Sequence, residues 1–395
     1  MPIAESESAC AEFAPRFGAA RSGLYVHVPF CSAICPYCDF AVSRRRSGDG
    51  DLFVAALADE ASRVAAAGVG EDVTFDTLYL GGGTPSALSA AQLERLIEAL
   101  SSRLPLATRI HVTFEANPED VNRQTARRWH ELGVNGVSLG LQSLTDSSLR
   151  FLGRRHSARE GREALETLIE VGFEWISADL IYSLPGSDPR RFADELGELP
   201  DVPHLSCYEL TIHEGTPFAR FEARGRLTQL PNVEKARWFH VVNGALAKRG
   251  FEHYEVSNFA REGGRSKHNA KYWSGVPYLG LGPSAHSFDG SRRWSNLAPW
   301  KEWAAALGAG RSPLAMHETL DAEALRLEEL MLRLRTSDGI DLKGYSERHG
   351  HDLRESRRDV VERYLADGSL ILEGGRLRPS VDGMAIAERL AVDLS

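Results

Sequence analysis

The sequence lacks long hydrophobic runs and an excess of positive charge, and its first twenty residues lack the pattern of a secretory leader. No stretch approaches the roughly 18 uninterrupted apolar residues that a membrane-spanning helix needs. Lys and Arg number 46 against 55 Asp and Glu, which gives a net charge of −9, and such a charge repels phosphate backbones and anionic lipid headgroups. The first twenty residues have neither the basic start nor the apolar middle of a signal peptide. We therefore expect a cytoplasmic protein that does not bind nucleic acid.

Cysteine is also scarce, with five residues in 395. Two of them, Cys10 and Cys207, stand alone, and we expect them to be ordinary small residues. The other three, Cys31, Cys35 and Cys38, are clustered, which in a reducing compartment favours a metal site over a disulfide framework. The chain is 43% hydrophobic and 26% charged, so it has enough apolar residues for a large core and no composition typical of disorder.

Short aliphatic runs alternate with amphipathic segments from Leu24 onward. This alternation is typical of βα units around a parallel sheet. The amphipathic segments include 90–104 and 158–171, whose apolar residues recur every three or four positions. The sequence therefore predicts an α/β fold, a partial (β/α)6 TIM-like barrel. Its expected strands are 24–28, 77–80, 110–114, 137–139, 176–181 and 204–210.

The pattern changes twice further along the chain. An aromatic, Gly-rich stretch begins near Phe251 and is interpreted as a lid or an extension. From about Met316 the chain looks helical and finishes with apolar runs on both sides of Gly374-Gly375, which indicates a β-hairpin and a winged-helix-like module. This module holds more acidic than basic residues, so we expect packing or partner docking there. The predicted domains are an N-terminal extension (1–22), the barrel (23–250), the extension (251–315) and the C-terminal domain (316–395).

The three clustered cysteines directly follow the first predicted strand, with the spacing C-x-x-x-C-x-x-C. Three thiolates on one short loop can converge on a single soft metal centre. A structural zinc site needs a fourth ligand, which His27 could supply. The alternative is an iron–sulfur cluster that has three irons held by thiolates and one left open.

Other polar or Gly-rich motifs also follow the predicted strands, where a barrel places its chemistry. The turn Gly81-Gly82-Gly83-Thr84 either lets a ligand approach the backbone or is only a tight turn. Glu115 is either a ligand-binding carboxylate or a solvated loop acid. Asp179 lies inside an otherwise apolar strand, so it needs a partner or a function, and a buried ion pair with Arg154 is the structural alternative.

The cysteine motif, with Tyr37 before its third Cys, resembles the radical S-adenosylmethionine (SAM) superfamily. The resemblance implies a 4Fe-4S cluster on Cys31, Cys35 and Cys38, with SAM on the open iron, where reductive cleavage of SAM yields a 5′-deoxyadenosyl radical. The segments 25–31, 81–85, 113–118, 139–143 and 179–182 together resemble the oxygen-independent coproporphyrinogen III oxidase subfamily. That resemblance implies SAM contacts from Tyr25, Gly82 and Glu115. It also implies second-SAM contacts from Tyr37, Gly83, Thr84, Gln142, Arg154 and Asp179.

Two departures from the oxidase pattern favour its relatives, the HemW family of heme chaperones. The oxidases carry a further Cys two residues after the third one, where this chain has Phe40. The segment from His268 to Trp273 matches the H-N-x-x-Y-W signature of HemW-type proteins. An imidazole can ligate heme iron and aromatic rings can stack on a porphyrin, so the resemblance suggests His268 as a heme contact. The alternative is that His268 and Trp273 only cap the barrel by packing. His286 is a second candidate ligand.

We expect a heme chaperone that delivers heme to acceptor proteins and holds a 4Fe-4S cluster and SAM. Whether SAM is cleaved stays open. A coproporphyrinogen III oxidase and a zinc-stabilised scaffold are the alternatives. The sequence permits a transient membrane association and a homodimer without deciding either.

Overall fold

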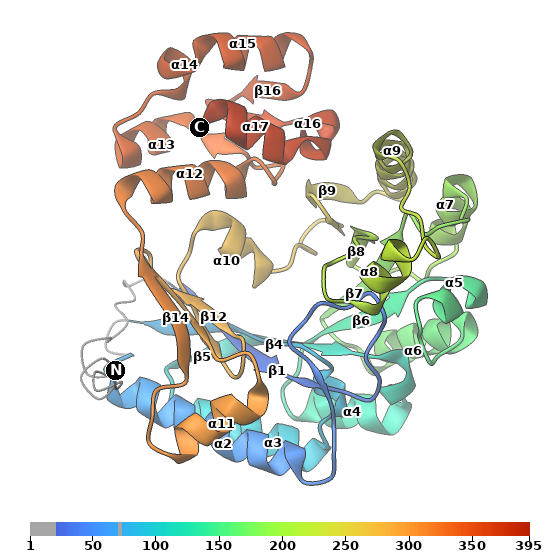
Figure 1. Ribbon diagram of the computed structural model, residues 1–395, viewed down its shortest axis with the longest axis vertical. Coiled ribbons are helices and arrows are strands. Elements are labelled where there is room, and N and C mark those ends of the chain that lie inside the picture. The colour runs from blue at the N-terminus through green and yellow to red at the C-terminus, as the bar shows by residue number, and fades with distance from the viewer. Residues whose placement is uncertain (1–20, 70–72) are drawn as a thin grey trace.

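The computed structural model describes residues 21–69 and 73–395 (Figure 1). The N-terminal extension expected for residues 1–22, with Cys10, lies outside the described residues except for its last two positions.

A twelve-stranded sheet in the order β14-β13-β12-β11-β1-β4-β5-β6-β7-β8-β10-β9 forms the centre of the molecule. Its six βα strands are parallel neighbours and are buried on both faces, as parallel strands covered by helices are. Each overlaps a strand predicted from the sequence, so the α/β prediction is confirmed. They are β1 (Arg21–Val28), β4 (Thr74–Gly82), β5 (Leu106–Ala116), β6 (Gly136–Gln142), β7 (Trp175–Tyr182) and β8 (His204–Glu209).

The helices that follow these strands start at clear sequence signals. Ser89 caps one helix with Gln92 and Ser157 caps another with Glu160, each in a reciprocal capping box. The second helix ends at Gly172, which has a φ of 90°. The helices are α2 (Asp49–Ala66), α3 (Ala90–Ser101), α4 (Arg123–Glu131), α5 (Asp146–Phe151), α6 (Ala158–Val171), α7 (Pro189–Gly197), α8 (Pro217–Ala223) and α9 (Asn232–Lys248), with short 3-10 turns at Pro85–Ala87 and Pro118–Asp120.

The aromatic, Gly-rich stretch extends both edges of the sheet. β9 (Glu252–Glu255) and β10 (Asn258–Ala260) continue from β8, and β11 (Tyr278–Leu281), β12 (His286–Phe288), β13 (Arg292–Asn296) and β14 (Leu314–Thr319) continue from β1. β11 runs parallel to β1, and Leu24 lies opposite Leu279. α10 (Asn269–Ser274) and α11 (Trp300–Gly308) connect these strands. The sequence indicated an extension here without its strands.

A smaller unit at one end of the molecule has its own hydrophobic cluster (Figure 1). It pairs helices with a three-stranded antiparallel sheet, β15-β17-β16, and the hairpin expected around Gly374-Gly375 is present. Met316, where the helical part was expected to begin, lies in β14, and the first helix starts at Ala322. The elements are α12 (Ala322–Arg333), β15 (Ile340–Asp341), α13 (Leu342–His349), α14 (Leu353–Ser356), α15 (Arg358–Ala366), β16 (Leu370–Glu373), β17 (Arg376–Pro379), α16 (Val381–Ala385) and α17 (Ala387–Leu394).

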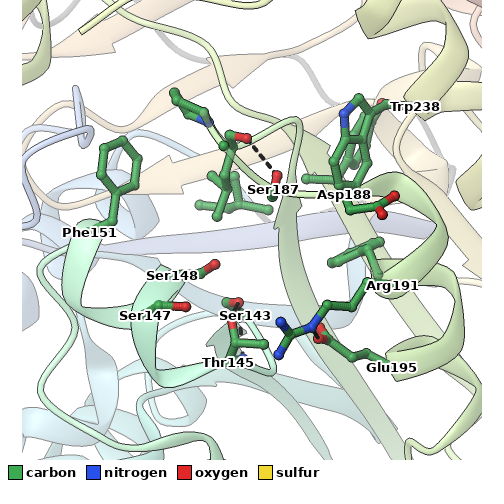
Figure 2. A pocket seen from close by; sticks show the side chains of 16 residues that line it. Ser143, Thr145, Ser147, Ser148, Phe151, Ser187, Asp188, Arg191, Glu195 and Trp238 are labelled. Carbon is green, nitrogen blue, oxygen red and sulfur yellow. Dashed lines mark hydrogen bonds and ion pairs between the residues drawn. The ribbon is translucent and has the colours of Figure 1, made fainter.

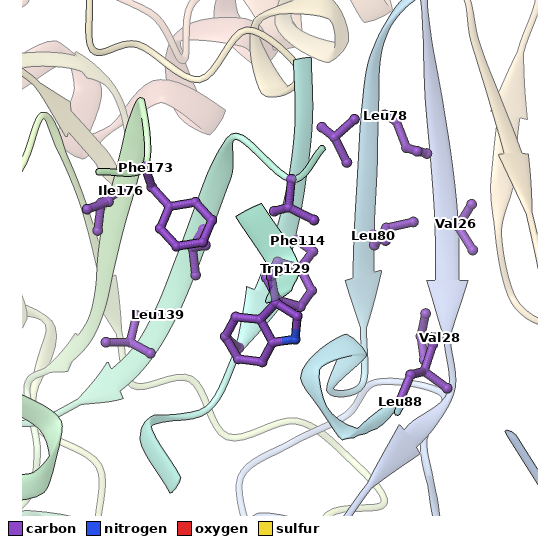
Figure 3. Packing of buried hydrophobic residues seen from close by; sticks show 14 of the residues in the cluster. Val26, Val28, Leu78, Leu80, Leu88, Phe114, Trp129, Leu139, Phe173 and Ile176 are labelled. Atoms are coloured by element: carbon purple, nitrogen blue, oxygen red, sulfur yellow. The ribbon is translucent and has the colours of Figure 1, made fainter. Parts of the chain in front are cut away.

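The main core lies between the sheet and the helices that cover it (Figure 3). Phe114 on β5 meets Trp129 on α4 edge to face, with ring centroids 4.8 Å apart. Phe30 meets Phe53 on α2 in the same way at 5.5 Å. These contacts anchor the segment after β1 and the end of β5, and therefore the loops that follow them. Among the described helices, none has the length and apolarity to span a membrane.

Candidate functional site

The cysteine loop follows β1 and is fixed at several points. Its ends form a two-stranded sheet of β2 (Phe30–Cys31) and β3 (Ser43–Arg44). Inside the loop, the Cys38 N–H donates to the Cys35 carbonyl at 3.2 Å. α8 covers the loop from outside, because the Phe218 N–H donates to the Pro36 carbonyl at 3.0 Å and the Phe218 ring lies 6.3 Å from that of Tyr37.

A cavity of about 480 Å³, which we call the cysteine cavity, opens beside this loop at the carboxyl ends of the parallel strands. It collects every site residue predicted from the sequence except Tyr25 and His268. These residues are Cys31, Cys35, Tyr37, Cys38, Gly82, Gly83, Thr84, Glu115, Gln142, Arg154 and Asp179. Side chains from five strand ends and the cysteine loop therefore face one volume, as expected for a βα barrel.

The three thiols in this cavity are free, and each is partly exposed. Burial raises the pKa of the Cys31 thiol and raises the pKa of Cys38 to about 11. Thiolates in such a place need a positively charged centre to balance them. In the part of the chain that the structure describes, no three His, Cys, Asp or Glu side chains are arranged as a metal-ion cluster. The loop thus offers three soft donors, but its thiols do not converge on one point as they stand.

His27, the fourth ligand that a zinc site would require, is already engaged. Its Nε2 donates to the Ala41 carbonyl at 3.0 Å, so its Nδ1 accepts from the Tyr25 hydroxyl at 3.1 Å. Burial lowers the pKa of His27, so the ring is neutral. Both ring nitrogens are used, and a Cys3His zinc site has no support in this geometry.

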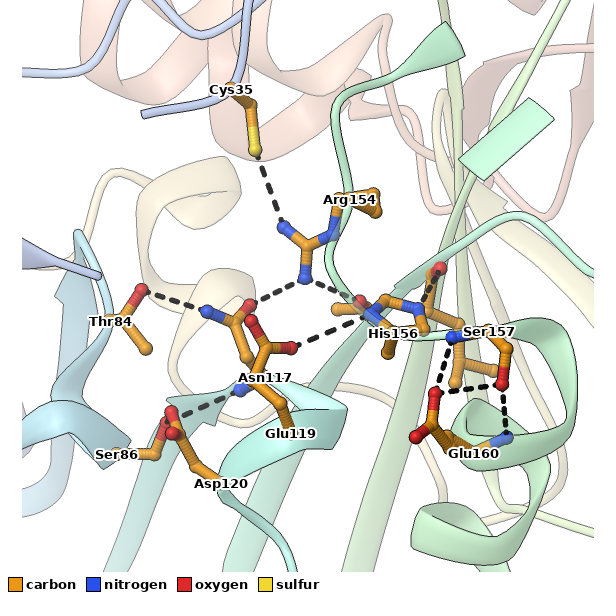
Figure 4. Close-up of polar contacts among 12 residues, drawn as sticks. Cys35, Thr84, Ser86, Asn117, Glu119, Asp120, Arg154, His156, Ser157 and Glu160 are labelled. Carbon is orange, nitrogen blue, oxygen red and sulfur yellow. Dashed lines mark hydrogen bonds and ion pairs between the residues drawn. The ribbon is translucent and has the colours of Figure 1, made fainter. Parts of the chain in front are cut away.

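Arg154 is the cation of the cysteine cavity (Figure 4). Its Nη1 lies 3.5 Å from the Cys35 sulfur, and its Nη2 donates to Asn117 Oδ1 at 2.6 Å. Asn117 in turn donates to Thr84 Oγ1 at 3.1 Å. The buried Nε has no hydrogen-bond partner, and no ion pair to a carboxylate is found for Arg154 among residues 21–69 and 73–395. A guanidinium held beside a thiol in this way suits an anionic ligand or cluster.

Asp179 is held by hydroxyl groups, and the ion pair with Arg154 considered from the sequence is not formed. Ser138 Oγ donates to its Oδ2 at 2.8 Å and Ser177 Oγ to its Oδ1 at 2.9 Å. Burial raises the pKa of Asp179, although the serine hydroxyls oppose the shift. These hydroxyl donors are neutral, so the carboxylate has no countercharge, which fits a group that receives a polar or cationic ligand.

Glu115 is fixed between the second and third parallel strands. The Tyr79 hydroxyl donates to its Oε1 and the Gly82 N–H to its Oε2, both at 3.1 Å. Burial, followed by the negative charge of Asp179, raises the pKa of Glu115 to about 7. It is therefore no solvated loop acid, and its carboxyl can exchange a proton near neutral pH.

The glycine turn is required by packing as much as by any ligand. Gly82 has a φ of 99°, and a Cβ there would lie 2.5 Å from the His27 ring. A Cβ on Gly83 would lie 2.7 Å from the carbonyl oxygens of Val28 and Phe30. The tight turn considered from the sequence is thus real, and it lies at the wall of the cysteine cavity. Gln142, on the same wall, adopts a φ of 63° without being glycine, a strain typical of functional positions.

A second cavity of about 370 Å³ adjoins the first, with Asp39, Phe40, Gly82 and Glu115 lining both. We call it the tyrosine cavity. It contains Tyr25, the predicted residue that the cysteine cavity lacks. Its remaining walls come from His27, Ala41, Tyr272, Tyr278, Ser284 and His286.

His268 lies in neither cavity. It is buried against β4, where its Nδ1 contacts Thr77 Oγ1 at 2.9 Å and its Nε2 contacts the Tyr272 hydroxyl at 2.8 Å. Burial lowers the pKa of His268 to about 3. With both nitrogens engaged, the ring has the packing role that the sequence left open, and its partners would have to release it before it could ligate iron.

A third cavity, of about 290 Å³, lies between α5 and α7 (Figure 2). It is lined by serines, Arg191 and Trp238, and none of the predicted site residues takes part. The cysteine and tyrosine cavities therefore form the candidate site.

Comparison with known proteins gives the family. The radical SAM superfamily matches residues 25–198, and the HemN C-terminal domain matches residues 320–386. The heme chaperone HemW of Lactococcus lactis is 36% identical over 319 residues, which are 80% of this chain and 82% of that protein. The chain belongs to the HemW family.

Two further similarities agree with this assignment to the HemW family. The HemW of Mycobacterium tuberculosis H37Rv is 35% identical, and the match covers 93% of each chain. The structure of the coproporphyrinogen III oxidase HemN from Escherichia coli has a TM-score of 0.82, with 20% sequence identity, and the match covers 98% of this chain and 92% of that one. At that identity, the likeness shows that HemN and this chain share the radical SAM fold.

Sequence reasoning missed two residues that hold the site together. Asn117 bridges Arg154 and Thr84, and Tyr79 holds Glu115. Asn117 follows the third parallel strand directly, so its position was a signal that could have identified it. Tyr79 lies inside a strand and gave no such signal. Cys207, as expected, is an ordinary buried residue of β8.

Proposed function

We propose that this protein is a heme chaperone: it binds heme and passes it to acceptor proteins, and its cysteine cavity holds a 4Fe-4S cluster and SAM. The observation that carries the proposal is that one cavity is lined by the three cysteines together with Arg154, Glu115 and Asp179. When bound, the cluster and SAM would supply one-electron chemistry at the open iron.

The donor chemistry of the cavity supports this cofactor set. Cys31, Cys35 and Cys38 supply three soft ligands, and His27 is not free to be a fourth, as a cluster with one open iron requires. Arg154 offers a positive charge to the thiolates and to a carboxylate group of SAM. Glu115 and Asp179 offer carboxylates to its ammonium group or ribose hydroxyls.

Further site residues are proposed as SAM contacts because they line the two cavities. Tyr25 and Gly82 lie beside Glu115 where the two cavities meet. Tyr37, Gly83, Thr84 and Gln142 line the cysteine cavity and would contact SAM there.

Heme delivery is favoured over porphyrinogen oxidation by Phe40. The side chain is 61% exposed and lines both cavities, so the position offers a solvent-facing aromatic ring where the oxidases have a thiol. The relatives of highest identity named above are described as heme chaperones, which agrees with this choice.

The test of heme binding is a heme titration of the anaerobically reconstituted protein, followed at the Soret band. We expect saturable binding of about one heme per chain, because the tyrosine cavity beside the cofactor cavity, about 370 Å³ in volume, suits a single ligand. In parallel, coproporphyrinogen III, SAM and a reductant are incubated with the protein under anaerobic conditions. Accumulation of protoporphyrinogen would show an oxidase and contradict the proposal.

The test of the cluster compares Cys35→Ala with Cys207→Ala. Both remove a thiol, but only Cys35 lines the cysteine cavity. Iron and sulfide should fall sharply in the first variant and stay at the wild-type level in the second. Equal iron and sulfide in both variants, or one zinc without iron in the wild type, would refute the assignment.

A further inference from the structure

The imidazole of His286 is the unassigned ligand-type side chain beside the site. His286 begins β12 and lies in the wall of the tyrosine cavity with its side chain exposed. No hydrogen bond of its ring is found within the described part of the chain. By contrast, the rings of His27 and His268 have both nitrogens engaged. His286 therefore presents an imidazole that can coordinate a metal without breaking an internal hydrogen bond.

The cavity in front of His286 has the walls that a flat aromatic ligand needs. Tyr272, Tyr278 and the exposed ring of Phe40 line it, and such rings stack favourably on an extended π-system. Its volume, about 370 Å³, lies within the range of small-molecule sites. Phe40 and His286 are both exposed, so the cavity is open to solvent on their side and a ligand can enter and leave.

The loop that presents His286 is anchored by a glutamate of α2. Glu60 on α2 accepts from the Gly282 N–H at 2.7 Å and from Asn296 Nδ2 at 2.5 Å, and Asn296 Nδ2 also donates to the Gly282 carbonyl at 2.8 Å. Ser284, between the anchor and the histidine, has a φ of 60°. The imidazole is thus placed on a fixed support, as a ligand-binding side chain should be.

We propose that His286 is the axial ligand of the heme iron and that the tyrosine cavity holds one edge of the porphyrin. This inference rests on the proposed heme chaperone function and identifies its binding site. Partial burial, followed by the positive charge of Arg293, lowers the pKa of His286, which favours the neutral imidazole that can coordinate a metal. Asp39 and Glu115 lie in the cavity wall, so the propionates of the heme point outward to solvent.

The site also lies next to the cofactor cavity. Phe40, Gly82 and Glu115 line both cavities, so heme on His286 would be a direct neighbour of SAM. SAM bound in the cysteine cavity would thereby fill part of the wall against which the porphyrin packs.

The test is a heme titration of the full, reconstituted chain as wild type, His286→Ala and His240→Ala. His240 is an exposed histidine on α9, outside both cavities, and is the matched control. We expect His286→Ala to weaken heme binding by about tenfold or more, since loss of a metal ligand costs at least as much as loss of an outer-shell partner. Its absorption and electron paramagnetic resonance (EPR) spectra should lose the imidazole-ligated form, and added free imidazole should restore it. His240→Ala should behave as wild type.

A fourth variant, His268→Gln, separates the two histidines of the sequence hypothesis. If His286→Ala keeps the wild-type affinity and spectrum, the inference is overturned while the chaperone function stands. If only His268→Gln loses the imidazole spectrum, with cluster content and fold intact, the ligand is His268 and the inference is also wrong. If the wild type binds no heme, the proposed function itself fails.

Discussion

Glu60 is a buried carboxyl whose ionisation should make the stability of the protein depend on pH. It is 4% exposed, and the Gly282 N–H and the Asn296 amide, which donate to it, are both neutral. Burial raises the pKa of Glu60 from 4.5 to about 7. Below pH 4.5 the carboxyl is protonated in both the folded and the unfolded chain, so it causes no pH-dependent loss of stability. Between pH 4.5 and 7 only the unfolded chain releases the proton, so the free energy of unfolding falls as the pH rises.

The size of the pH-dependent loss of stability follows from the pKa shift of Glu60. A difference of 7 − 4.5 = 2.5 pH units corresponds to a loss of about 3 kcal/mol above pH 7, of which about 2 kcal/mol develops between pH 5.5 and 8. Glu60→Gln keeps the size of the side chain and removes the titration. Any hydrogen bond lost in the variant costs the same at every pH and does not affect the comparison.

The assay is urea unfolding of the apo protein at several pH values, followed by tryptophan fluorescence. Relative to Glu60→Gln, the wild type should lose about 2 kcal/mol between pH 5.5 and 8. Glu214→Gln, at an exposed loop position, corrects for the removal of one negative charge. Parallel pH profiles for wild type and Glu60→Gln would refute the reasoning, because they would show that Glu60 titrates alike in the folded and unfolded chains.

Three other predictions concern the candidate site. Gly82→Ala should lower the free energy of unfolding by about 3 kcal/mol, because its Cβ would overlap the His27 ring. The control is Gly133→Ala, at a positive φ with open space around it. It should lower the free energy of unfolding clearly less in the same urea experiment. Arg154→Ala should weaken SAM binding to the reconstituted protein about tenfold or more, as measured by calorimetry. Arg155→Ala, at the exposed neighbouring position, should leave SAM binding unchanged. Equal affinities of the two variants for SAM would contradict the role of Arg154. His268→Ala should destabilise the fold by about 3 kcal/mol, because two buried hydroxyl partners lose their hydrogen bond; an unchanged urea midpoint would argue against its packing role.

The barrel and most of the site could be predicted because their signals are local. Strands such as 176–181 are apolar runs buried on both faces, and the polar residues just after such strands must meet at one edge of the sheet. The cysteine motif and Glu115 were identified in this way. The expected positions of the C-terminal hairpin and of α6 were confirmed for the same reason, since Gly374-Gly375 and the apolar residues spaced by three and four in 158–171 are short-range signals.

Features that depend on distant partners could not be predicted. An ion pair with Arg154 was the structural alternative for Asp179, but its partners are serines on β6 and on its own strand. His268 is buried against Thr77, which is 191 residues away in the sequence. No sequence feature near the H-N-x-x-Y-W segment indicates that contact. β14 escaped detection because it is an edge strand whose residues are nearly all exposed, so it has no apolar alternation.

The cysteine cavity is proposed to hold a cluster with an open iron that binds SAM. The most direct measurement is the EPR spectrum of the reduced, reconstituted protein before and after SAM is added. We expect a 4Fe-4S signal that changes shape with SAM in the wild type and in Cys207→Ala, and that is lost in Cys35→Ala. A cluster signal that SAM leaves unchanged, or one that survives in Cys35→Ala, would contradict the account.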